Sequence, residues 1–112
     1  MSTALIIIVA FLAVVFVISG LSKASGNEKG LSGTRDVNVP DVLARLVGLV
    51  ETAAALGLLI GLKYDWMLWV PLMTVWALMA GAIYFHFRAD KAKTSFPAFF
   101  LLTLISIALV TI

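Results

Sequence analysis

The sequence predicts an all-α fold, a bundle of four transmembrane helices that forms one domain over residues 1–112. Three observations predict it. Hydrophobic residues make up 62% of the chain and charged residues only 12%, against about 25% charged residues in soluble domains. The apolar residues also form four stretches, each near the roughly 20 residues that a helix needs to cross a bilayer. Together these properties exclude a soluble globular domain, and the absence of cysteine excludes a disulfide scaffold.

The first predicted span covers residues 2–21, and no charged side chain precedes Lys23. Its β-branched residues are compatible with a helix there, because in lipid every backbone polar group must be satisfied within the segment. Residues 22–39 are polar and rich in glycine, which predicts a loop. Val37 and Val39 alternate with polar residues, so we expect at most a short extended piece at the end of this loop.

The second predicted span covers residues 40–62 and begins at Pro40, since proline is favoured in the first turn of a helix. Residues 63–65 make a very short turn, so the spans on either side should be antiparallel neighbours. Residues 66–87 form the third predicted span, in which tryptophans mark one membrane interface. After a polar third loop, the fourth predicted span covers residues 96–112.

The basic residues predict how the chain is oriented in the membrane. The side that holds loops 22–39 and 88–95 carries seven of the eight Lys and Arg residues, and the other side carries only Lys63. Because cytoplasmic loops are enriched in Lys and Arg, both loops should be cytoplasmic and both termini outside, in a bacterial cell membrane. The small net charge of +2 therefore reflects membrane orientation, and we expect no nucleic-acid partner.

Small residues predict where the helices pack together. Lipid tails are as apolar as leucine, so membrane helices associate through close packing at small side chains. Gly57 and Gly61 form a GxxxG pattern in the second span, and Gly48 belongs to a second face of small residues on the same helix. Ala77 and Gly81 form a similar stripe on the third span. The second span should therefore lie centrally and contact at least two neighbours.

Glu51 is the most informative polar residue, because it lies about 15 Å from the start of its helix and hence near the middle of the membrane. A charge there is costly unless it is paired or faces water. Lys23, Arg45 and His86 are its candidate partners, all toward the predicted cytoplasmic half. Two interpretations remain open: a structural network that holds the helices in register, or a site that handles a ligand or protons.

Several segments together resemble the DoxX-like family of small membrane proteins. They are GLSK at 20–23, GTRDVNVP at 33–40, ARLVGLVETAAALGLLIG at 44–61 and the end of the third span. The resemblance implies a four-helix membrane protein whose family polar positions are Lys23, Arg45, Glu51 and His86. Some relatives are named for a membrane subunit of thiosulfate:quinone oxidoreductase, and others are associated with membrane redox and oxidative-stress complexes.

Three functions remain open. The first is a non-catalytic or accessory subunit of a larger membrane complex, respiratory or redox, which would contact other membrane subunits or a second copy of the chain. The second is a proton-coupled transporter of small molecules that uses Glu51. The third is a quinone- or lipid-binding subunit of a membrane oxidoreductase, with Arg45, Glu51 and His86 around the head group. One histidine and no cysteine make a metal site unexpected, and we expect neither a covalently bound cofactor nor enzymatic activity from the chain by itself.

Overall fold

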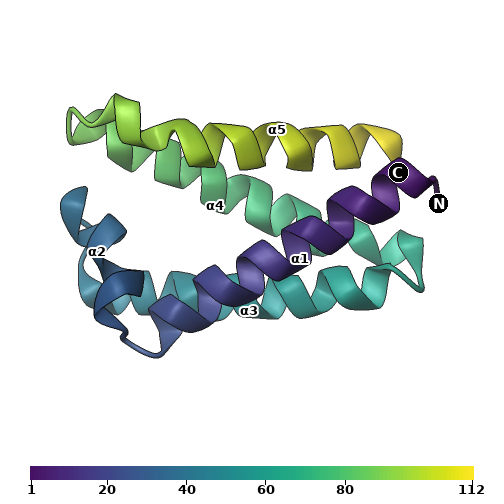
Figure 1. Ribbon diagram of the computed structural model, residues 1–112, viewed down its shortest axis with the longest axis horizontal. Helices are drawn as coiled ribbons and strands as arrows, with labels where there is room; N and C mark the ends of the chain where they lie inside the picture. Colours follow the sequence, from purple (N-terminus) through teal and green to yellow (C-terminus); the bar gives the residue numbers. More distant parts are fainter.

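The computed structural model describes residues 1–112 and confirms the predicted fold class. It contains only helices, four of which are long and apolar enough to cross a membrane. Both termini lie at one end of the bundle, and a short additional helix, α2, lies at the other end (Figure 1). In chain order the elements are α1 (Thr3–Ala24), α2 (Glu28–Asp36), α3 (Asp41–Gly61), the 3-10 turn η1 (Asp65–Leu68), α4 (Trp69–Arg88), the 3-10 turn η2 (Ala92–Ser95) and α5 (Phe96–Thr111).

Helix α1 extends three residues past the predicted end at Leu21. Its first turn is capped by Ser2, whose side chain accepts a hydrogen bond from the backbone N–H of Leu5 at 3.1 Å, as serine often does at this position. At the other end, the extension brings Lys23 into the last turn of the helix. The direction of the Lys23 side chain is therefore set by the helix, which orients it toward α3.

Helix α2 corrects the prediction of a loop over residues 22–39. The side chain of Asn27 caps this helix by accepting a hydrogen bond from Lys29 N at 2.9 Å. No extended piece forms, because the backbone turns at Asn38, which has a positive φ of 64°. The residues on either side of it, Val37 and Val39, are buried. Nine residues that include two glycines have little helical stability alone. Burial of Leu31 in a small apolar cluster with these two valines stabilises the helix instead.

Helix α3 lies between α1 and α4 and packs against both. At the α1–α3 crossing the two backbones touch, because a Cβ atom added to Gly48 would lie 2.7 Å from the carbonyl oxygen of Gly20. On the α4 side, a Cβ atom at Gly57 would lie 3.2 Å from Pro71. Gly61 is packed against Leu68 in the turn between the two helices. The small residues of α3 therefore set how closely its neighbours approach.

The predicted packing stripe on α4, Ala77 and Gly81, is not covered by another helix of this chain. A Cβ atom added to Gly81 would meet nothing within 4 Å, and Ala77 is exposed. Side chains of this size permit close packing but do not cause it, and here no neighbouring helix covers them. Both residues instead line a cavity.

The apolar core fills the half of the bundle nearer the termini. Fully buried side chains come from each of the four long helices, among them Phe16, Leu58, Leu72 and Ile105. Helices α4 and α5 lie side by side (Figure 1) and are joined by a hydrogen bond from the indole N–H of Trp76 to the hydroxyl of Ser106, 3.1 Å long. The half of the bundle that carries α2 is packed less completely.

Candidate functional site

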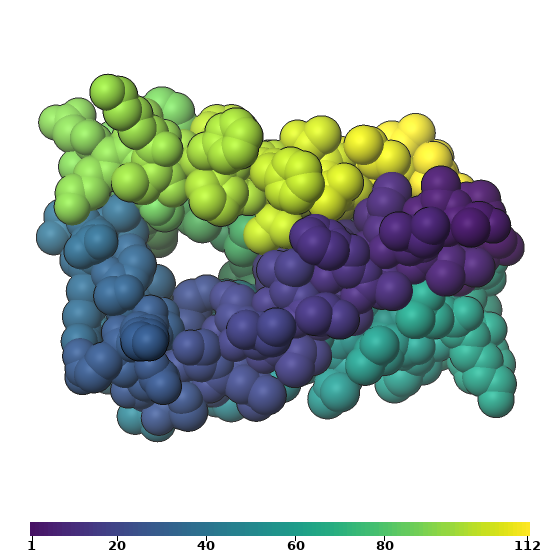
Figure 2. Space-filling model, viewed as in Figure 1, coloured from purple at the N-terminus to yellow at the C-terminus, as the bar shows by residue number.

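A cavity of about 350 Å³ lies in the half of the bundle that carries α2. Its wall is built from the end of α1, from α2, from the first half of α3 and from the second half of α4. Figure 2 shows the molecule hollowed between α2, α1 and the α4–α5 pair. Ten of its 17 lining residues are hydrophobic. The cavity is therefore a mainly apolar space that contains a few polar groups.

Glu51 and Lys23 form an ion pair in this wall. Lys23 lies in the last turn of α1, and its Nζ lies 2.7 Å from Oε1 of Glu51 on α3. The same ammonium donates to the hydroxyl of Ser19, one helical turn earlier on α1, also at 2.7 Å. The Glu51 side chain is 0% exposed, whereas that of Lys23 is 18% exposed. The pair thus joins a fully buried carboxylate to a lysine side chain that is partly exposed.

The second carboxylate oxygen of Glu51 has no partner. Oε2 is buried and makes no hydrogen bond within the protein. Most buried polar atoms in proteins have at least one partner, and each exception calls for an explanation. Glu51 is also one of the residues that line the cavity, so its unpartnered oxygen belongs to the wall of that space.

His86 lines the same cavity from α4. Its Nδ1 lies 2.7 Å from the carbonyl oxygen of Ala82. A carbonyl oxygen only accepts hydrogen bonds, so Nδ1 carries the hydrogen in this contact. The other ring nitrogen, Nε2, is then an acceptor in the neutral ring. The imidazole is thereby held in one orientation in the wall.

Arg45 does not belong to the cavity. Its Nε donates to the backbone carbonyl oxygen of Ala24 at 3.1 Å, at the end of α1. Helix ends leave carbonyl groups without partners inside the helix, and arginine side chains are favourable there. The structure therefore brings three of the four predicted polar residues to one cavity and places Arg45 on the outside of the α1–α3 contact.

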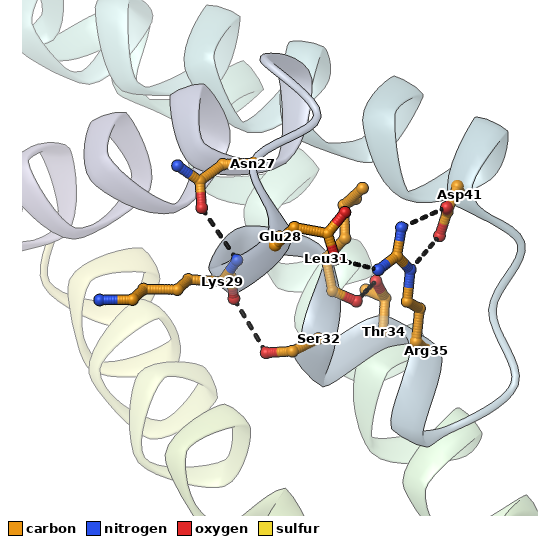
Figure 3. A network of polar contacts seen from close by, with 8 residues as sticks. All are labelled: Asn27, Glu28, Lys29, Leu31, Ser32, Thr34, Arg35 and Asp41. Carbon is orange, nitrogen blue, oxygen red and sulfur yellow. Dashed lines mark hydrogen bonds and ion pairs between the residues drawn. The ribbon is translucent and has the colours of Figure 1, made fainter.

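A group of ionic contacts holds α2 beside the start of α3 (Figure 3). Arg35 donates to both carboxylate oxygens of Asp41, at 3.0 and 2.7 Å. It also donates to Glu28, at 2.6 Å. The hydrogen bond to Asp41 and then that to Glu28 raise the pKa of the Arg35 guanidinium above its ordinary value. This side chain therefore stays charged and holds α2 over the cavity.

Sequence reasoning missed the part of the wall that α2 provides. Gly30, Gly33 and Thr34 line the cavity from this helix. The available signals were local: Asn27 is a good capping residue, and Glu28 in the first turn is favourable for a helix. The sequence contains no comparable signal for where such a short helix would dock.

The fold and its mainly apolar cavity define an integral membrane protein with four spanning helices. The model of the DoxX-like family matches residues 7–108, which is nearly the whole chain. The chain therefore belongs to the DoxX-like family, as the resemblance predicts. No curated protein and no solved structure matches the chain.

Proposed function

We propose that this protein binds a small, mainly apolar molecule from the membrane in the cavity beside Glu51. One observation carries the proposal: a fully buried carboxylate with an unpartnered oxygen forms part of the wall of a mainly apolar cavity. A bound molecule that supplied a polar group there would satisfy Oε2. The rest of the molecule would contact apolar side chains.

The size and lining of the cavity support a ligand with a small head group. Ligand pockets commonly measure about 300–1,000 Å³ and combine apolar walls with a few placed polar groups. At about 350 Å³ the cavity is at the small end of this range. A quinone ring or the polar end of a lipid has this size and combination of surfaces, and both types of molecule are present in the bilayer.

We further propose that the protein works as a non-catalytic subunit or accessory protein of a larger membrane assembly. The chain has no cysteine and a single histidine, so it has no thiol for redox chemistry. A redox reaction of the bound molecule would then use groups of a partner subunit. Coupled proton uptake in liposomes that depends on Glu51 would instead favour the transporter hypothesis.

A variant that fills the cavity tests the binding function. Gly81→Leu should lower the affinity for a short-chain hydroquinone at least tenfold, because nothing lies within 4 Å of a Cβ atom there and the new side chain has room in the cavity. Binding can be followed by calorimetry with the protein in lipid nanodiscs. Ala53→Leu, on the exposed face of α3, is the matched control and should bind like the wild type. Absence of binding to the wild type, or equal binding to both variants, would contradict the proposal.

A further inference from the structure

We infer that the molecule bound in this cavity is neutral and carries a hydroxyl group, which donates a hydrogen bond to Oε2 of Glu51. The inference rests on the proposed binding function and specifies the hydrogen-bonding class of the ligand. It selects alcohols, phenols and hydroquinones over ethers, ketones and oxidised quinones of the same shape.

The first reason is the hydrogen-bonding character of the free atom. An ionised carboxylate only accepts hydrogen bonds, and Oε2 of Glu51 is buried without a donor. A carbonyl or ether oxygen of a ligand would place a second acceptor against it. A hydroxyl group supplies the missing donor, and hydrogen bonds to charged groups are stronger than those between neutral groups.

The second reason is the charge of the site. The ammonium of Lys23 lies 2.7 Å from the other oxygen of Glu51 and balances its charge. A cationic ligand would lie close to this ammonium, and an anionic ligand would lie close to the carboxylate. Like charges at such separations repel strongly in a medium of low dielectric constant. A neutral donor avoids both conflicts.

The third reason is that a second group in the wall also offers an acceptor. With Nδ1 of His86 donating to the carbonyl oxygen of Ala82, Nε2 of the neutral ring can only accept. Two of the three ammonium hydrogens of Lys23 are already used by Glu51 and Ser19. Oε2 of Glu51 and, in the neutral ring, Nε2 of His86 are therefore acceptors, and one ammonium hydrogen of Lys23 remains as a donor. A hydroxyl group, which both donates and accepts, suits this set of groups.

A matched pair of ligands tests this inference on the unmodified protein. A para-alkylphenol and its methyl ether have nearly the same shape and apolar surface, but only the phenol donates a hydrogen bond. In nanodiscs of zwitterionic lipid, measured by calorimetry, the wild type should bind the phenol at least tenfold more tightly than the ether. No variant has to fold for this comparison.

Variants then assign the preference to Glu51. The double variant Lys23→Met with Glu51→Leu replaces the ion pair by apolar side chains, a change that buried pairs often tolerate. It should bind the phenol and the ether with equal affinity. Asp65→Asn, which removes an exposed carboxylate in the turn before α4, should keep the preference of the wild type.

The outcomes separate the two proposals. If the wild type binds both ligands equally, the donor inference is wrong and the proposed binding function stands. If it binds neither ligand and no short-chain hydroquinone, the binding function itself is wrong. If the preference for the phenol persists in the double variant, Glu51 is not the acceptor.

Discussion

At the scale of single residues, the ion pair between Lys23 and Glu51 is the feature on which the site depends. Its two members differ in their surroundings: the Glu51 side chain is 0% exposed and the Lys23 side chain is 18% exposed. A lysine near the end of a helix can extend toward the membrane surface if it loses its partner. A carboxylate buried deep in the bundle has no such option, so the two halves of the pair are not equivalent.

This asymmetry predicts the order of stability of two single variants. Lys23→Met should lower the free energy of unfolding by about 3–5 kcal/mol, because it leaves a buried carboxylate without its ion-pair partner. Glu51→Leu should cost less, because the remaining ammonium can reach water. Thermal unfolding in detergent micelles measures both. Equal losses, or a larger loss for Glu51→Leu, would contradict this account of the pair.

The residue scale also shows how far the sequence can predict the site. Helical geometry predicted that Glu51 lies inside the bundle, because Glu51 is on the same face of α3 as small residues such as Gly48. The actual partner of Glu51 depends on how α1 crosses α3, which periodicity on one helix cannot provide. The position of the Arg45 side chain also depends on this crossing. It reaches the end of α1 and does not line the cavity, whereas Lys23 and His86 do.

At the scale of elements, the four long helices and α2 differ in how strongly the sequence determines them. A span of apolar residues must be helical in lipid whatever its neighbours are, so composition alone predicted these helices. Helix α2 has nine residues, and its stability depends on Leu31 finding an apolar partner and on Arg35 finding acidic ones. Such contacts are known only once the chain has folded, which explains why the sequence indicated a loop there.

The ionic contacts of α2 predict how firmly it covers the cavity. Arg35→Ala should let α2 open more often, so that a cysteine introduced as Val37→Cys, at a site 5% exposed, reacts about two- to fivefold faster with a water-soluble maleimide. The natural chain has no cysteine to interfere. Higher salt should speed labelling of the protein with intact Arg35, because exposed ion pairs are screened.

Lys29→Ala is the matched control for this experiment. It removes another exposed cation of α2, but the Lys29 side chain makes no ionic contact there (Figure 3). The rate of maleimide labelling at Val37→Cys should therefore be the same as in the protein that keeps both Arg35 and Lys29. If the Val37→Cys protein is labelled at the same rate with and without Arg35→Ala, the ionic contacts do not hold α2 in place.

At the scale of the whole molecule, four crossings place the two termini at one end and the basic residues of α2 and η2 at the other (Figure 1). Charge distribution then predicts orientation. A reporter that is active only outside the cytoplasm should be active when fused after Ile112 and inactive when inserted at Asn38, between α2 and α3. The opposite pattern would show that both termini are cytoplasmic.

The crossing of Gly20 and Gly48 has a consequence for how this protein could be redesigned. The two backbones are in contact there, so there is little room to change how α1 and the first half of α3, which carry Lys23 and Glu51, lie against each other. To enlarge the cavity for bulkier ligands, substitutions would have to be made on α4, where Ala82 and other small side chains line the opposite wall. Engineering of selectivity should therefore vary that helix and preserve the glycine contact.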